Sequence, residues 1–331
     1  MESGVLPAGP GALGSIPVAH IPASGTQHSI RAGDYEAVIA SVGASLRSLT
    51  YASRDLVVPF GADEVRPGFR GATLAPWPNR VVDGRYSFGG EDYVLSLTEP
   101  KRGHALHGLA GWLDFTVADK GPSHVTLVAV VEPQAGYPWR ITIETTYALG
   151  PDGLTQTVTA TNDSRTAAPW GTGPHPYLRA GDSPLESWTL SLPASDVLAV
   201  TPDRLAPIAL EPVDLDPRRF DFRAPHEIGA AEIDHAFTAL ARGADGRAEV
   251  RVTDAAGQGV AMVWGASCPW VQVHTADIEP GHPFHRIGLA VEPMTCAPDA
   301  FNADAYPFDT GLIVLGPDES SEASWRISAI G

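Results

Sequence analysis

Apolar and polar residues alternate in short stretches along most of the chain, with turn residues between the stretches. Residues 154–162 place Thr at every second position, as a half-buried antiparallel strand does. Gly43 divides the segment 37–49 into two predicted strands, and Gly89-Gly90 predicts the turn of a hairpin over 85–95. Further strands are predicted over 125–131, 140–149, 248–254, 260–264, 270–275 and 312–315. Residues 234–242 fit either a short helix or a strand.

Few segments carry a 3.6-residue period over ten or more positions, and neither an internal repeat nor a break in composition divides the chain. The series of strands therefore predicts one all-β domain over residues 27–331, a sandwich of large, mostly antiparallel sheets. Residues 1–26 are rich in Gly, Pro and Ala and predict a loose N-terminal arm.

The composition narrows the classes of partner. With 22 Lys and Arg against 39 Asp and Glu in 331 residues, the net charge is -17. Such a chain repels nucleic-acid phosphates and anionic membrane surfaces, so we expect neither as a partner. Cys268 and Cys296 have no metal-like spacing and are interpreted as reduced core thiols. There is no apolar run of ~20 residues and no positively charged start, which predicts a soluble cytoplasmic protein. We expect a monomer or a homodimer, between which the sequence does not distinguish.

Two segments carry a candidate acid and base. In 291–302, Glu292 follows an apolar, strand-like run and precedes a proline, an arrangement that holds a carboxylate rigidly at a sheet edge. In 170–177, His175 stands between two prolines, with glycines and aromatic residues around it. A fixed imidazole and a fixed carboxylate can act together as an acid–base pair.

Further polar residues stand in apolar or turn-rich surroundings. Asn79 and Arg80 follow a rigid Ala-Pro-Trp-Pro loop, which would project both side chains or form an ordinary surface turn with an Arg–carboxylate pair. His104 and His107 lie between glycines; their spacing is compatible with a metal, although imidazoles hydrogen-bonded in the fold are the commoner reading.

Two more candidates occur further along the chain. Asp234 is an acidic residue within an apolar stretch, and a helix cap is the plainer interpretation. In the strand 270–275, alternation places Gln272 on the face shared by Trp270 and His274, a face that a sandwich can also leave in solvent.

Taken together, these motifs resemble the aldose 1-epimerases, the galactose mutarotase family. The resemblance covers residues 30 to 330 and rests on motifs in the order and approximate spacing of that family. These motifs are Val42–Leu49, Asn79-Arg80, Leu106-His107-Gly108, Gly173–Tyr177, Asp234 with Phe237, Gln272, Glu292-Pro293 and Pro298–Asn302.

The resemblance implies a β-sandwich of the galactose mutarotase type that interconverts the α and β anomers of a free monosaccharide, with no metal or other cofactor. It assigns His175 as general acid and Glu292 as general base. The positions that it implies for binding the sugar are Asn79, Arg80, His107, Asp234 and Gln272, with Tyr177 beside them in the catalytic loop. One of the Trp residues, Trp270 for example, would supply an apolar face to the pyranose.

The resemblance leaves the preferred aldose open among glucose, galactose and a modified sugar such as sulfoquinovose. Several motifs are similar to a bacterial branch apart from the best-known galactose enzymes, and His104 replaces an Asn-like residue of many members, which leaves its role open.

Three other functions remain as alternatives. A hexose-6-phosphate 1-epimerase would need cations near the site, for which Lys101, Arg102 and Arg179 are candidates. A glycosidase or lyase would use Asp234 and Glu292 as two carboxylates. A non-catalytic sugar-binding module would need no acid and base.

Overall fold

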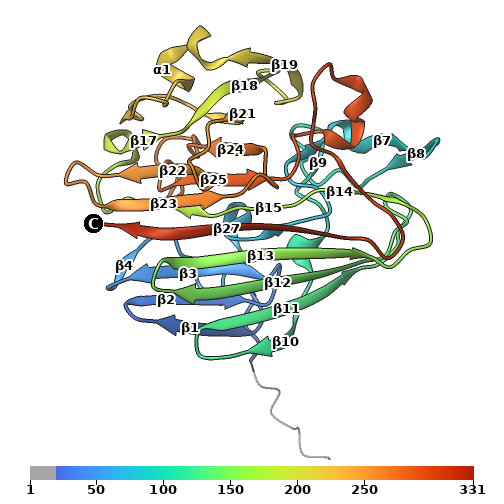
Figure 1. Cartoon of the computed structure of the whole chain (residues 1–331), viewed down its shortest axis with the longest axis horizontal. Helices are drawn as coiled ribbons and strands as arrows, with labels where there is room; N and C mark the ends of the chain where they lie inside the picture. The colour runs from blue at the N-terminus through green and yellow to red at the C-terminus, as the bar shows by residue number, and fades with distance from the viewer. Residues whose placement is uncertain (1–19) are drawn as a thin grey trace, which may run out of the picture.

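The computed structural model describes residues 20–331, which fold almost entirely into β-strands and turns (Figure 1). Residues 1–19, most of the predicted arm, lie outside the described residues. At the end of that arm, Ser24 is buried and its N–H donates to Ala62 O, while the Thr26 N–H donates to Ser41 Oγ. We therefore propose that the folded domain starts at or before Ser24 rather than at residue 27.

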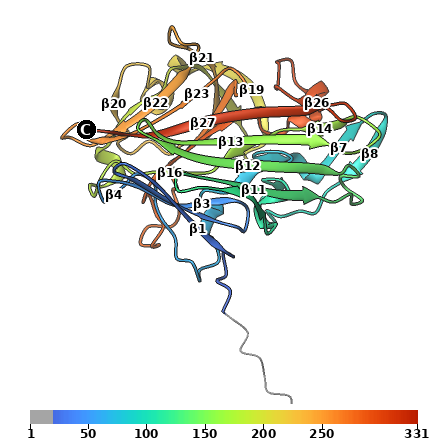
Figure 2. The same ribbon diagram turned by 60° about the horizontal axis from the view of Figure 1, so that its bottom comes forward.

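A nine-stranded antiparallel sheet extends through the whole molecule (Figures 1 and 2). Its strands, in spatial order, are β10 (Thr116–Lys120), β11 (His124–Val131), β12 (Ile141–Gly150), β13 (Gly153–Asn162), β27 (Ser320–Ile330), β23 (Gly259–Trp264), β22 (Ala248–Thr253), β17 (Thr189–Ser191) and β20 (His226–Glu227). Alternate residues of β12 and β13 are buried, which confirms the half-buried strands expected from the period-2 pattern.

Two further sheets complete the sandwich. The four-stranded sheet packs against β11, β12 and β13 and is drawn in blue in Figure 1. It consists of β1 (Gln27–Ala32), β2 (Tyr35–Ala40), β3 (Ser45–Tyr51) and β4 (Arg54–Asp55). The six-stranded sheet contains, in order, β16 (Tyr177–Leu178), β25 (Leu289–Met294), β24 (Trp270–His274), β21 (Asp234–Leu240), β18 (Ala194–Val200) and β19 (Pro207–Pro212).

The remaining elements are short. Four strand pairs connect the sheets: β5 (Thr73–Leu74) with β15 (Gly173–Pro174), β6 (Arg80–Val81) with β9 (Ala105–Leu106), β7 (Arg85–Phe88) with β8 (Glu91–Val94), and β14 (Ala168–Trp170) with β26 (Ile313–Leu315). The described helices are α1 (Pro217–Phe220) and the 3-10 turns η1 (Pro67–Phe69), η2 (Val82–Gly84), η3 (Ala110–Trp112), η4 (Leu185–Ser187), η5 (Val213–Leu215) and η6 (Ala300–Ala305).

The main hydrophobic core joins the three sheets, with members from Ile30 in β1 to Ile327 in β27. The strands β21, β24 and β25 of the six-stranded sheet contribute odd-numbered residues there, among them Phe237, Val271 and Val291. Because neighbouring residues of a strand point to opposite faces, the even-numbered residues of these three strands lie on the other face of this sheet. Three of the candidate site residues, Asp234, Gln272 and Glu292, lie on that face.

The structure resolves one open assignment and corrects two others. Residues 234–240 form the strand β21, so Asp234 begins a strand and does not cap a helix. Glu292 does not end its strand at a sheet edge, since β25 continues through Pro293 to Met294. The proline is tolerated there because its nitrogen points away from β24, on the side where the N–H of Val291 donates to Pro176 O.

Both cysteines are buried and free. Among residues 20–331, no helix is long and apolar enough to cross a membrane.

Candidate active site

The backbone register of three strands brings four predicted or neighbouring polar residues together. Gln272 on β24 pairs with Glu292 on β25, and Asp234 on β21 pairs with His274 on β24. All four are even-numbered and share the face opposite the main core. The Gln272 amide Nε2 donates to Asp234 Oδ1 at 2.7 Å. Gln272 is buried, so this face is not the solvent-exposed one that the sequence also allowed.

His175 reaches the same face from a different part of the chain. It lies between β15 and β16, where the His175 carbonyl accepts the Gly71 N–H at 2.7 Å and the next carbonyl, of Pro176, holds β25. The imidazole Nε2 is 3.4 Å from Glu292 Oε1, and both side chains are buried. The predicted acid and base are therefore adjacent, although 117 positions separate them in the sequence.

A loop pairing places the remaining predicted residues beside His175. β6 pairs with β9, so the Asn79 N–H donates to His107 Nδ1 at 3.1 Å and the His107 N–H donates to Asn79 O at 2.7 Å. Since Nδ1 accepts a hydrogen bond, the neutral imidazole of His107 carries its proton on Nε2. Its ring centroid is 5.0 Å from that of His175, and the Tyr177 ring is 5.2 Å from His175 on stacked planes.

Arg80 is held by a carboxylate that sequence reasoning missed. Glu99 accepts two hydrogen bonds from the Arg80 guanidinium, at 2.8 and 3.1 Å, and a third from Arg102 at 2.9 Å. One of the two Arg80 nitrogens bound to Glu99, Nη2, also lies 3.9 Å from Asp234 Oδ2. Nothing in the local sequence around Glu99 distinguishes it from an ordinary surface residue, because its partner is 19 positions away.

Burial shifts the pKa values of His175 and Glu292, the predicted acid and base, in opposite directions. Desolvation, together with the negative charge of Asp234, raises the pKa of Glu292 well above its usual value, and Arg80 only partly opposes this. Desolvation, with a smaller contribution from His274, lowers the pKa of His175 to about 3. Burial also lowers the pKa of His107. Both shifts favour the uncharged forms of the two side chains, that is, a proton on Glu292 rather than a second proton on the His175 imidazole.

Three buried polar atoms of this group have no hydrogen-bond partner among the described residues: His175 Nδ1, Gln272 Oε1 and Glu292 Oε2. Buried polar atoms are normally satisfied, so a cluster of orphaned ones indicates a place for polar ligand groups. Asp234 and His274, with side chains 26% and 27% exposed, connect the group to solvent. His274 was missed as a site residue, although the alternation of its strand already placed it on the face of Gln272.

His104 does not join this group. Its Nδ1 accepts the Asp83 N–H at 3.2 Å and its Nε2 contacts Arg204 O at 2.9 Å, so both nitrogens hold loops together. The interpretation of His104 as a metal ligand is therefore wrong, and that of a hydrogen-bonded imidazole is confirmed. No group of three or more His, Cys, Asp or Glu in residues 20–331 is arranged to hold a metal ion. Trp270 is fully buried between Ala236 and Met294 and offers no free face to a sugar.

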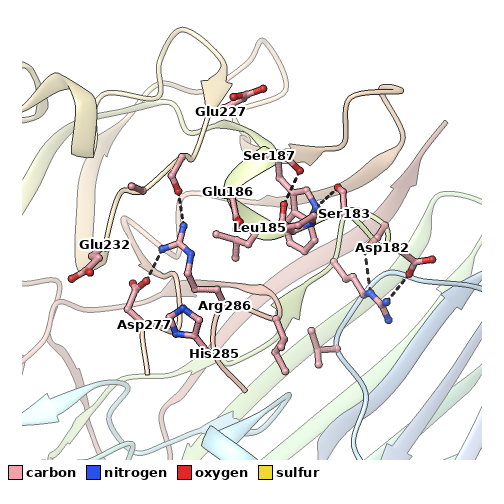
Figure 3. A pocket seen from close by; sticks show the side chains of 18 of the residues that line it. Asp182, Ser183, Leu185, Glu186, Ser187, Glu227, Glu232, Asp277, His285 and Arg286 are labelled. Carbon is pink, nitrogen blue, oxygen red and sulfur yellow. Dashed lines mark hydrogen bonds and ion pairs between the residues drawn. The ribbon is translucent and has the colours of Figure 1, made fainter. Parts of the chain in front are cut away.

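A pocket of about 1180 Å³ lies apart from these residues, between η4 and the loop 277–287 (Figure 3). It contains none of the eight predicted site residues. Its Arg286 is bound to Asp277 Oδ1 at 2.5 Å and to two backbone carbonyls, and its Arg179 is bound to Asp55 and Asp182. Since both guanidinium groups are engaged, we assign the chemistry to the His175–Glu292 group and not to this pocket.

Comparisons with known proteins agree with this architecture. The family model "Aldose 1-epimerase" matches residues 26–328, and the chain belongs to that family. It is 36% identical over 282 residues to YihR, an uncharacterized protein of Escherichia coli K12, covering 85% of this chain and 87% of YihR.

Solved structures show the same fold at low identity. The GalM/aldose epimerase homologue from C. elegans matches with a TM-score of 0.78 at 20% identity, over 92% of this chain and 100% of that one. The galactose 1-epimerase of Lactobacillus acidophilus matches with a TM-score of 0.75 at 16% identity, over 92% and 94%. The predicted all-β, galactose-mutarotase-like sandwich is thereby confirmed.

Proposed function

We propose that this protein is an aldose 1-epimerase, which interconverts the α and β anomers of a free monosaccharide. The observation that carries the proposal is the buried contact of His175 Nε2 with Glu292 Oε1 at 3.4 Å, surrounded by orphaned polar atoms. Family membership supports the reaction class.

The reaction needs one proton acceptor and one proton donor. Glu292 removes the proton of the anomeric hydroxyl while His175 delivers a proton to the ring oxygen, and the bond between C1 and the ring oxygen breaks. The open aldehyde rotates about C1–C2. The freed hydroxyl then attacks the other face of C1, with the proton transfers reversed. Each positioned acid or base contributes typically ~10²–10⁴-fold in rate.

The pKa shifts suit this exchange. A raised pKa makes the Glu292 carboxylate a stronger base, and a lowered pKa makes the His175 imidazolium a stronger acid. The same shifts reduce the fraction of enzyme in that charged form, because the shared proton prefers Glu292. Ring opening and closure exchange the two roles, so a single mobile proton serves both directions. The pair titrates as one unit rather than as two independent residues.

The other residues bind and orient the sugar in this proposal. Asp234, Gln272 and the Arg80 guanidinium present acceptors and donors for hydroxyl groups, and the His107 Nε2–H can donate to a sugar oxygen. Asn79 fixes the loop that carries Arg80, since its Oδ1 accepts the Arg80 N–H at 2.9 Å. Because C1 changes configuration during turnover, specificity must come from contacts with the other hydroxyl groups.

Polarimetry and exchange NMR on freshly dissolved aldoses test the proposal. We expect His175→Ala and Glu292→Gln each to reduce the equilibration rate by about 10²–10⁴-fold. Matched controls are His124→Ala and Glu132→Gln, which remove the same side-chain types from exposed ion pairs. Variants of His175 and Glu292 that equilibrate anomers at the parent rate, or a wild type inert toward every aldose, would refute it.

The same assay separates the alternatives. A hexose-6-phosphate 1-epimerase would prefer glucose 6-phosphate to glucose, yet Arg102 and Arg179, two of its three candidate cations, are already bound to carboxylates. A glycosidase or lyase would release new reducing ends from oligosaccharides.

A further inference from the structure

One tryptophan of this chain differs from all the others. Seven of the eight lie within residues 20–331 as core side chains with no more than 4% exposure, namely Trp77, Trp139, Trp170, Trp188, Trp264, Trp270 and Trp325. The eighth, Trp112, ends η3 and is 55% exposed. The indole is the largest apolar side chain, and Trp112 is the one Trp among the described residues that presents its ring to solvent.

The buried side chain of Arg66 holds the Trp112 ring in place. The Arg66 guanidinium carbon lies 4.7 Å from the ring centroid, in a cation–π contact. Arg66 is itself buried and donates to Val42 O, Ser45 Oγ and Gly111 O at 3.1, 2.7 and 2.5 Å. Burial lowers the pKa of Arg66 to about 10, so it keeps its charge at neutral pH. Trp112 is thus exposed and yet held in place.

Phe69 connects Trp112 to the acid–base group. Its ring centroid lies 5.8 Å from that of Trp112, 4.7 Å from that of His107 and 6.5 Å from that of His175. The backbone of Phe69 has φ +55°, a left-handed conformation that bulky residues rarely adopt. This strained turn directs the ring toward both imidazoles. We call Phe69 and Trp112 together the aromatic shelf.

We propose that the aromatic shelf is a sugar-stacking subsite, which packs against the apolar C–H face of the pyranose. The inference rests on the proposed function for the identity of the ligand as a sugar. Aromatic faces carry partial negative charge and attract the weakly positive C–H groups of a pyranose ring. Asp234, Gln272 and Glu292, on β21, β24 and β25, offer polar atoms to hydroxyl groups and have no ring to cover a C–H face. A shelf already held in position binds with little loss of side-chain entropy.

The exposed indole provides a direct measurement. Wild-type protein is titrated with D-glucose, D-galactose and their methyl glycosides while tryptophan fluorescence is followed, and kcat and KM are measured by polarimetry. The methyl glycosides have no free anomeric hydroxyl and report binding without turnover. The variants are Trp112→Ala, Trp112→Phe and the control Leu215→Ala, which truncates an exposed apolar residue in η5.

We expect at least one sugar to change the fluorescence of the wild type, of Leu215→Ala and of Glu292→Gln, and not that of either Trp112 variant. Trp112→Ala should raise KM about 3- to 10-fold, with kcat within about twofold of the parent. Trp112→Phe keeps an aromatic face and should raise KM less. If circular dichroism shows that Trp112→Ala is unfolded, Trp112→Phe decides, through its missing fluorescence response and its raised KM.

Two results would overturn the inference: no fluorescence response of the wild type to any of these sugars, or Trp112 variants whose KM equals that of the parent. Free aldoses that bind through Trp112 without being equilibrated would instead refute the epimerase proposal and leave the subsite intact. Equilibration that proceeds with parent KM in both Trp112 variants would refute the subsite alone.

Discussion

Glu99 should be essential for holding Arg80 in the site, and its replacement tests how the site is built. The two side chains are 12% and 8% exposed, and two hydrogen bonds join them. In Glu99→Ala the guanidinium remains buried without its main counter-charge. Its nearest other carboxylate is Asp234, 3.9 Å away, so we expect Arg80 to move toward Asp234 and to withdraw from the sugar.

The expected loss of stability in Glu99→Ala follows from the burial of the Arg80–Glu99 ion pair. Breaking a buried ion pair by removing one partner costs about 3–5 kcal/mol. At about 2 °C per kcal/mol for a chain of this size, Tm should fall by roughly 6–10 °C. Glu99→Gln keeps one acceptor oxygen and should cost less, about 1–3 kcal/mol. The exposed pair of Glu132 with Arg140 supplies the control, since surface pairs contribute about 0–1 kcal/mol.

Calorimetry and polarimetry check this together. Glu99→Ala should lower Tm and raise KM, whereas Glu132→Ala should change neither. Burial opposes the ionisation of Glu99, but its bonds to Arg80 and Arg102 lower its pKa below the usual 4.5. Its contribution to stability is therefore present above that value and lost as pH falls through the lower folded pKa. A Glu99→Ala protein with parental Tm and KM at neutral pH would show that Glu99 does not position Arg80.

Three further predictions concern the site. The value of kcat/KM should fall on the alkaline side, where Glu292 loses its proton at a raised pKa. On the acid side kcat/KM should stay high until His175 gains a second proton near its pKa of about 3. An alkaline fall in kcat/KM that is retained in Glu292→Gln would contradict this assignment. Asp234→Asn should raise KM roughly 10- to 100-fold, and should move the alkaline limb to lower pH because its charge helps to raise the pKa of Glu292. Gly108→Ala should lower kcat/KM, because a Cβ there would lie 2.1 Å from Ala75 O and displace the adjacent loop; Gly257→Ala is the control, with a similar positive φ and open space around it.

The sequence predicted the strands well because alternation is a local property. The hairpin at Gly89-Gly90 and the strands β11, β12 and β13 lie within one or two residues of their predicted bounds. The extent of β25 was harder to predict, because proline usually interrupts a strand. Only the direction of hydrogen bonding at Val291 shows that no donor is needed at position 293.

Part of the candidate site could also be predicted from the sequence. The eight candidate residues stand in motifs that can be seen in the sequence, and the structure brings them together. Glu99, Phe69 and Trp112 have no such motif, because their partners are far along the chain or depend on an unusual backbone turn. Pairings of this kind exist only after folding, and residue types alone do not predict them. The prediction that Trp270 offers an apolar face to the sugar was wrong for the same reason, since the residue type alone does not show whether an aromatic side chain is buried.

The pairing of β24 with β25 fixes two candidate site residues independently of the loop that joins these strands. Gln272 and Glu292 are paired directly across the two strands, while residues 275–288 form the connection between them. A loop of another length could replace that connection without changing the direction in which the Glu292 side chain points. Deleting one residue inside β25 upstream of Glu292 would instead turn it toward the hydrophobic interior. In the proposed epimerase, residues of this connection could therefore be exchanged while Gln272 and Glu292 stay in register.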